Sequence, residues 1–186
     1  HLGAWPLLWL GWATRFRPTQ DTTLVLAPVA DGGPILDFWF QGEEAPEHFL
    51  IENRIQESFD GSLLEGGLVV HQVDEAVIGA GIASNRVNSG LTPGMRVLEA
   101  DGDFDMYFGW NRGDAFDPFP GAGKRTRIDD LTVPATRTFV TRAASGRYDT
   151  ETSPCSMRTS SFSARVRLSS GRASSTRARS VDAAKP

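Results

Sequence analysis

Two stretches of the chain, Glu47–Asn53 and Gly67–Val73, are apolar runs whose successive side chains fall on opposite sides of an extended chain. In the first stretch Phe49 and Ile51 fall on one side, while Leu50 falls on the other. A period of two residues in the direction of the side chains is that of a β-strand. Because a Gly-containing segment separates the two stretches, the pattern predicts a pair of neighbouring strands.

Shorter apolar runs predict further strands. Thr22–Val29 and Ile35–Phe40 flank a turn-forming loop, Asp31–Pro34, and this arrangement is typical of a β-hairpin. Two more strand candidates flank an acidic turn, Met95–Leu98 and Met106–Trp110, and two alternate in strand fashion, Arg137–Thr141 and Phe162–Leu168, the latter within a possible last strand Ser161–Leu168.

Helical signals are few and short. Leu2–Trp12 places three tryptophans at helix-like spacing, but Pro6 and Gly11 limit any helix there to a short one. Glu75–Ile82 predicts a second short helix, and Ala83–Gly94 is rich in loop-forming residues. The predicted fold class is therefore mainly β, with antiparallel strands, hairpins and short helices.

The chain has 186 residues, enough for one domain with a sizeable core. We expect residues 1–168 to form a single β-rich domain or subdomain. Residues 169–186 are rich in Ser and Arg and lack apolar periodicity, so they predict a disordered tail. The single cysteine, Cys155, excludes an internal disulfide.

Charge is distributed unevenly along the chain. Residues 1–136 carry 9 Lys and Arg against 20 Asp and Glu, a net charge of −11, whereas residues 137–186 carry 10 against 3, a net charge of +7. An acidic body suits divalent cations or plain solubility. The basic segment has few aromatic residues for base stacking and no nucleic-acid motif, so we expect no nucleic-acid partner. No apolar run approaches the ~18 residues that span a membrane, so we expect no membrane span.

Motifs of self-sufficient catalysis are missing from the sequence. The three histidines, His1, His48 and His71, do not form an H-E-x-x-H zinc motif, in which two imidazoles share one helix face. A G-x-S-x-G nucleophile elbow is also absent. The catalytic residues of this chain are therefore unknown from its sequence, and the chain alone is predicted to be inactive.

The strongest chemical signal is an acidic turn. Asp101, Asp103 and Asp105 alternate with other residues around a glycine. Alternating carboxylates in such a turn can converge their oxygens on a hard cation. Asp114 and Asp117 complete a site if the chain folds back. These five aspartates are therefore the candidate calcium ligands.

A second interpretation of the acidic turn stays open. The turn is not an EF-hand, because the sixth position is Met106 rather than Gly and the twelfth is Arg112 rather than Glu. Its side chains can instead be solvated and cap their own backbone through Asx hydrogen bonds.

The predicted strand pair carries three ionisable residues with two interpretations each. His71 is either a hydrogen-bonded structural residue or a ligand. Glu52 and Arg54 lie two residues apart on one strand face, so they pair with each other or with the neighbouring strand.

Five blocks of the chain and a Trp-rich start form a recognisable series: Leu2–Trp5 with Leu10–Trp12, then Phe49–Arg54, Leu68–Glu75, Pro93–Val97, Glu99–Gly102 and Gly113–Gly121. Taken in order, these blocks resemble the secreted bacterial zinc metallopeptidases of the immune inhibitor A type. The resemblance runs from Leu2 to Gly121 and departs from the family at Val70, where a Trp commonly precedes the strand His.

The resemblance implies an extracellular zinc metalloendopeptidase that acts on proteins and holds structural calcium. In that family the zinc-binding helix lies upstream of the segment resembled here, so the implied zinc ligands are not in this chain. The implied partners are the upstream zinc-bearing half and protein substrates. The alternatives are a non-catalytic secreted β domain that binds protein or carbohydrate, and an inactive paralogue.

Overall fold

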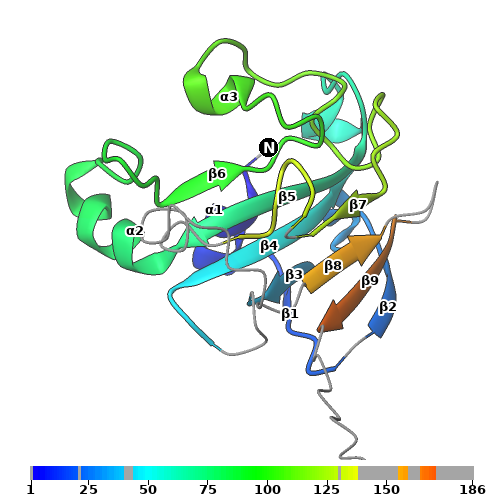
Figure 1. Cartoon of the computed structure of the whole chain (residues 1–186), viewed down its shortest axis with the longest axis horizontal. Coiled ribbons are helices and arrows are strands. Elements are labelled where there is room, and N and C mark those ends of the chain that lie inside the picture. The colour runs from blue at the N-terminus through cyan, green and yellow to red at the C-terminus, as the bar shows by residue number, and fades with distance from the viewer. Residues whose placement is uncertain are drawn as a thin grey trace, which may run out of the picture.

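Two β-sheets organise the chain (Figure 1). The computed structural model describes residues 2–20, 22–39, 44–129 and 131–137, together with the backbone of strands β8 (Cys155–Arg158) and β9 (Ala164–Ser170). The larger sheet has five strands in the order β1-β3-β4-β5-β6, and the smaller has four in the order β2-β9-β8-β7. The prediction of a mainly β fold with short helices is confirmed.

The larger sheet is mixed. β1 (Arg15–Phe16) runs parallel to β3 (Ile35–Phe38), which is antiparallel to β4 (Glu47–Arg54). β4 is antiparallel to β5 (Gly67–Asp74) along its whole length, and β5 is antiparallel to β6 (Met95–Val97). The strand pair predicted from the two apolar runs is therefore present as β4 and β5.

The smaller sheet is antiparallel throughout. β2 (Thr22–Leu26) pairs with β9, and β9 pairs with β8. β8 in turn pairs with β7 (Arg127–Ile128). The sheet thus joins an early strand to strands from the end of the described chain.

Helices are short, as predicted for the segments around the tryptophans and after β5. The α-helices are α1 (Ala4–Trp9), α2 (Glu75–Gly81) and α3 (Asp105–Phe108), and the 3-10 turns are η1 (Val29–Asp31), η2 (Ser58–Asp60) and η3 (Ile82–Ser84). Asp74 caps α2, because its Oδ1 accepts hydrogen bonds from the backbone of Ala76 and Val77. Within the described residues, no helix has both the length and the apolar character to cross a membrane.

The core lies on both faces of the larger sheet. Phe49, Ile51 and Val70 belong to one buried cluster, and Leu50 and Val73 belong to a second, which includes residues of α1. This division follows from the two-residue period of the strands, since neighbours along a strand point to opposite faces. The rigid centre of the fold is thus a sheet buried on both sides.

The predicted hairpin between Thr22–Val29 and Ile35–Phe40 is wrong. β2 pairs in the smaller sheet, whereas β3 pairs with β1 and β4 in the larger one. The 3-10 turn η1 stands between them, and the Gly33 N–H donates to the Pro28 carbonyl at 2.9 Å. This compact turn sends the chain from one sheet to the other instead of folding it back.

The predicted strand at Met106–Trp110 is also wrong, because this segment contains most of α3. Phe104 before α3 and Gly109 after it have φ of 60° and 72°. These left-handed residues bend the chain at both ends of the helix, so it cannot extend into a strand.

The C-terminal predictions are only partly described. β9 contains most of the predicted strand Ser161–Leu168 but continues to Ser170, so the first two residues of the predicted tail are paired in a sheet. Arg137 lies outside any strand, and residues 138–141 and 171–186 lie outside the described residues.

Candidate functional site

Backbone hydrogen bonds close the acidic loop, which comprises residues 99–117. Glu99 follows β6, and Asp117 lies on the segment that returns after α3. The Ala100 N–H donates to the Asp117 carbonyl at 2.8 Å, and Phe119 exchanges two hydrogen bonds with Leu68 of β5, at 2.7 and 2.8 Å. The return segment is thereby held against the larger sheet, and this places Asp117 beside Glu99.

Three carboxylates converge in this loop. Glu99, Asp101 and Asp117 each offer one oxygen, and these oxygens all lie within 4.8 Å of one another. Calcium binds oxygen ligands at about 2.3–2.6 Å, so two ligands of one ion stand up to about 5 Å apart. The observed spacing therefore fits oxygen ligands around one hard cation.

Glu99 is the most unusual member of this group. Its exposed fraction is 1 %, and neither carboxylate oxygen has a hydrogen-bond partner among the described residues. Burial, followed by the charge of Asp117, raises the pKa of Glu99. The backbone N–H groups of Met106, Asp105 and Tyr107 in α3 lie near enough to oppose the rise, although none of them has the geometry of a hydrogen bond to this carboxylate. An unpaired buried carboxylate costs on the order of a few kcal/mol, so this position favours a proton or a cation.

Asp117 also has a raised pKa, for similar reasons. Burial, opposed by the backbone N–H of Asp114 and reinforced by the charges of Asp114, Asp101 and Asp105, raises the pKa of Asp117 to about 6. A cation in the loop would relieve this repulsion among the carboxylates.

The structure brings together two of the five predicted ligands, Asp101 and Asp117. It adds Glu99, which the sequence interpretation did not include. Glu99 lies only two residues before Asp101, so the same alternation would have included it.

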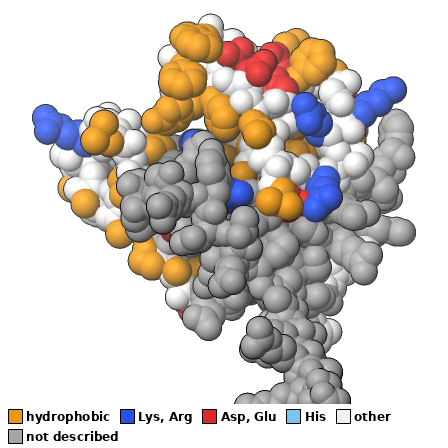
Figure 2. All heavy atoms as spheres, viewed as in Figure 1, with side chains coloured by type: hydrophobic (Ala, Val, Ile, Leu, Met, Phe, Trp, Pro, Cys, Tyr) orange, Lys and Arg blue, Asp and Glu red, His pale blue; other side chains and the backbone are white. Residues whose placement is uncertain are grey.

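The other three predicted ligands lie outside this group. Asp103 is exposed, and its backbone N–H donates to Asp101 Oδ1 at 3.2 Å. Asp105 accepts from the Asn111 side-chain amide at 3.3 Å, and Asp114 accepts from the Phe116 N–H at 2.7 Å. Asx-type hydrogen bonds are thus present in the loop beside the converging carboxylates. Figure 2 shows acidic side chains gathered at the top of the molecule, with hydrophobic side chains on either side.

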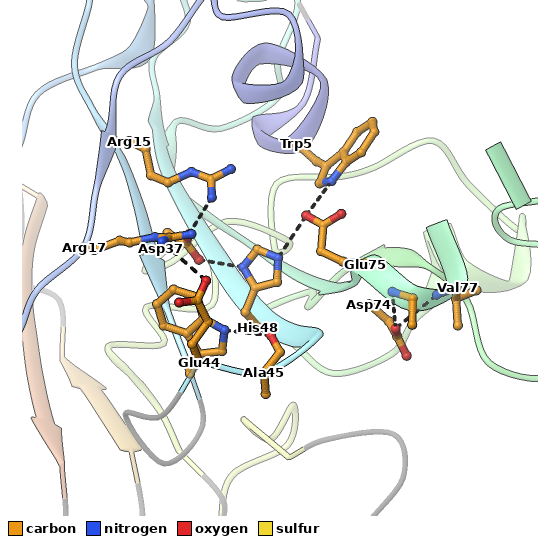
Figure 3. A network of polar contacts seen from close by, with 12 residues as sticks. Trp5, Arg15, Arg17, Asp37, Glu44, Ala45, His48, Asp74, Glu75 and Val77 are labelled. Atoms are coloured by element: carbon orange, nitrogen blue, oxygen red, sulfur yellow. Dashed lines mark hydrogen bonds and ion pairs between the residues drawn. The ribbon is translucent and has the colours of Figure 1, made fainter. Parts of the chain in front are cut away.

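A second polar network joins α1, α2 and the larger sheet (Figure 3). His48 Nδ1 lies 2.6 Å from Asp37 Oδ1, and His48 Nε2 lies 3.3 Å from Glu75 Oε1. The Trp5 indole donates to Glu75 at 3.0 Å, and the Arg17 guanidinium donates to Asp37 at 3.0 Å. His48 and Asp37 are buried, at 3 % and 0 % exposed, whereas Glu75 and Arg17 reach solvent, so only the centre of this network is built into the fold.

A third network lies on β4, β5 and η2. His71 Nε2 lies 2.8 Å from Glu52 Oε1, and Arg54 donates to Glu52 and to Asp60, both at 3.0 Å. Glu52 thus pairs both along its own strand and with the neighbouring strand, as the sequence allowed. The contact with Glu52 supports the structural interpretation of His71.

An apolar groove of about 360 Å³ lies beside α1. It is lined by Leu2, Leu7, Trp12, Val29 and Phe59. None of these side chains titrates, so the groove itself offers no acid, base or nucleophile.

No protein-family model, no curated protein and no solved structure matches this chain. The relation to the immune inhibitor A type of peptidase therefore rests on the quoted sequence blocks alone, and it stays a prediction.

Proposed function

We propose that this chain is a calcium-binding, β-rich part of a secreted zinc metalloendopeptidase, downstream of the zinc-binding helix. The observation that carries the calcium role is the buried Glu99 carboxylate, which lies unpartnered beside Asp101 and Asp117. The peptidase role is supported by the family resemblance.

The chemistry of the three carboxylates favours calcium. All three residues supply oxygen donors, and none supplies the imidazole or thiolate that zinc sites generally contain. Calcium accepts six to eight oxygen ligands in irregular arrangements, so backbone carbonyls and water can complete its shell. Magnesium requires a more regular octahedron and is expected to bind more weakly here.

The three converging carboxylates lie in segments that carry the family resemblance, Glu99–Gly102 and Gly113–Gly121. Two further resembling segments form most of β4 and β5, and Leu68 of β5 holds the loop through its hydrogen bonds to Phe119. A calcium ion would therefore hold together the two ends of a loop that is already attached to β5.

Zinc belongs to the upstream half in this proposal. That half would bind the metal and attack the peptide bond of protein substrates outside the cell. The present chain would support it and shape the substrate cleft, while calcium keeps the loop after β6 in place.

Thermal unfolding in a calcium titration tests the metal role. The melting temperature of the chain should rise with millimolar calcium, and rise less with magnesium. A ligand bound only to the folded state adds about 2.7 kcal/mol at a hundredfold excess over its dissociation constant. Asp101→Asn should reduce the shift in melting temperature strongly. Asp103→Asn should reduce it little, because Asp103 is exposed and lies outside the group of three carboxylates.

Two results would overturn the metal role. One is a melting temperature that does not change with calcium. The other is an equal loss of the shift in the Asp101 and Asp103 variants, because general screening of an acidic surface would produce it.

A non-catalytic secreted binding domain is the second candidate. The observation that favours it is a set of exposed aromatic side chains beside the acidic loop, with exposed fractions of 42 % to 73 % for Tyr107, Phe108 and Trp110. The coding sequence upstream separates the two candidates: an H-E-x-x-H motif there supports the peptidase, and its absence supports the binding domain.

A further inference from the structure

Aromatic side chains stand exposed on and just after α3. Tyr107, Phe108 and Trp110 are 42 %, 56 % and 73 % exposed. Their rings touch one another: Tyr107 meets Phe108 edge-on at 5.3 Å, and Phe108 stacks on Trp110 at 4.9 Å. α3 lies at one end of the molecule, beyond β6 (Figure 1). A group of large aromatic rings held in contact with water is a feature of interaction surfaces.

The surroundings of these rings are negatively charged. Residues 96–117 include six acidic residues and two arginines, a formal charge of −4. One bound divalent cation would leave this segment at −2, still negative. Asp103 is the exposed carboxylate of the segment. The surface is therefore complementary to a positively charged partner.

Two arginines of this chain lie over aromatic rings, next to acidic residues in one case and next to α3 in the other. The Arg17 guanidinium lies 4.6 Å from the ring centre of Trp39 and donates to Asp37 at 3.0 Å. Arg96 lies 5.4 Å from the ring centre of Phe104, directly before α3. In both places a planar guanidinium covers an aromatic face, and Trp110 is 73 % exposed although it stacks on Phe108.

We propose that the α3 surface, defined as Asp103, Tyr107, Phe108 and Trp110, binds arginine side chains of a basic peptide segment in a partner protein. One guanidinium stacks on Trp110, and another donates hydrogen bonds to the exposed carboxylate of Asp103. Arginine is preferred over lysine because its planar group both stacks on a ring and presents several donors to a carboxylate. The inference does not depend on zinc or on peptidase activity, so it goes beyond the proposed function.

Nuclear magnetic resonance on the full ¹⁵N-labelled chain in saturating calcium provides the test. The chain has five tryptophans, and the indole N–H signal of Trp110 should shift when an acetylated hexapeptide with two arginines is added. The matched lysine peptide should bind at least about twofold more weakly, and the uncharged citrulline peptide should not bind. Added salt should weaken the binding of the arginine peptide.

Two pairs of variants assign the binding to this surface. Trp110→Ala should raise the dissociation constant at least about threefold, read from the backbone amides of Gly109 and Asn111. Trp12→Ala, at 70 % exposed beside α1, is its control and should change nothing. Asp103→Asn should weaken binding about twofold, while the exposed Asp31→Asn in η1 should not.

Several outcomes would overturn the inference. They are equal binding of the citrulline peptide, equal effects of the Trp12 and Trp110 variants, and the lack of any shift with the arginine peptide. A Trp110 shift produced only by a neutral oligosaccharide or by anionic lipid vesicles would assign the surface to another class of partner, and would overturn it as well.

Discussion

The substitution Asp37→Asn should strongly destabilise the fold. Asp37 has no exposed surface and lies at the centre of the network in Figure 3. Its carboxylate contacts His48 Nδ1 at 2.6 Å, Arg17 Nε at 3.0 Å and Arg15 at 3.2 Å. Asparagine keeps the shape of the side chain but removes its charge and one acceptor.

The size of the effect follows from the burial of each partner. A hydrogen bond to a charged group contributes about 1.5–3 kcal/mol, and the contact with the buried His48 counts nearly in full. Arg15 and Arg17 are 37 % and 41 % exposed, so solvent screens their contacts to about 0.5 kcal/mol each. We expect a loss of about 3 kcal/mol in unfolding free energy, or about 6–12 °C in melting temperature.

Urea unfolding of the wild type and the variant at pH 7 measures this loss. Asp31→Asn on the exposed turn η1 is the control and should stay within about 0.5 kcal/mol of the wild type. A loss below about 1 kcal/mol for Asp37→Asn would refute the reasoning, because the network would then contribute little.

Acid should erase the difference between the two proteins. Burial alone would raise the pKa of Asp37, but hydrogen bonds from His48 and Arg17 and the charges of His48 and Arg15 lower it below 3.8. A lowered carboxyl pKa stabilises the fold above the unfolded value, and this contribution is lost as the pH falls through the folded value. The wild-type advantage should therefore shrink below about pH 4.

Single features of the structure and the sequence lead to four further predictions. Gly33→Ala should lower the free energy of unfolding by at least about 2 kcal/mol, because its Cβ would lie 2.1 Å from the Ala27 carbonyl oxygen. Gly79→Ala in α2 should instead raise the free energy of unfolding by up to about 1 kcal/mol, because nothing lies near its Cβ. Urea unfolding measures both changes. Calcium affinity should fall roughly tenfold from pH 7 to pH 5, because a proton competes with calcium at Asp117, whose pKa is raised to about 6. Calorimetric titration measures the affinity at each pH, and the same affinity at both would contradict the prediction. The chain alone should not hydrolyse casein with added zinc, and chelator-sensitive cleavage would show otherwise.

Local patterns predicted the centre of the fold. β4 and β5 follow from two short apolar runs on either side of a Gly-containing segment, and the contacts of Glu52 with Arg54 and with β5 follow from their shared strand face. The partner of β2 could not be predicted, because Thr22 pairs with Leu168, far along the chain. Local turn residues cannot reveal such a pairing.

The candidate site was predicted only in part, because it too depends on contacts between residues far apart in the sequence. The alternating aspartates indicated the correct loop, but which carboxylates meet depends on the return segment and on the hydrogen bonds between Phe119 and Leu68. Those contacts bring Asp117 to Glu99, whereas the left-handed Phe104 turns the chain away after Asp103. The contact between Asp37 and His48 left no motif in the sequence, since it depends on the pairing of β3 with β4.

We propose that Glu99, Asp101 and Asp117 hold one calcium ion. Calorimetric titration of the wild type and Glu99→Gln, with the exposed Glu57→Gln as control, measures it most directly. We predict one calcium per chain for the wild type and the control, and at least about tenfold weaker binding for Glu99→Gln. Without calcium, Glu99→Gln should melt at a higher temperature than the wild type, because it removes a buried unpaired charge. Unchanged calcium affinity in Glu99→Gln, or a lower melting temperature without calcium, would contradict the claim.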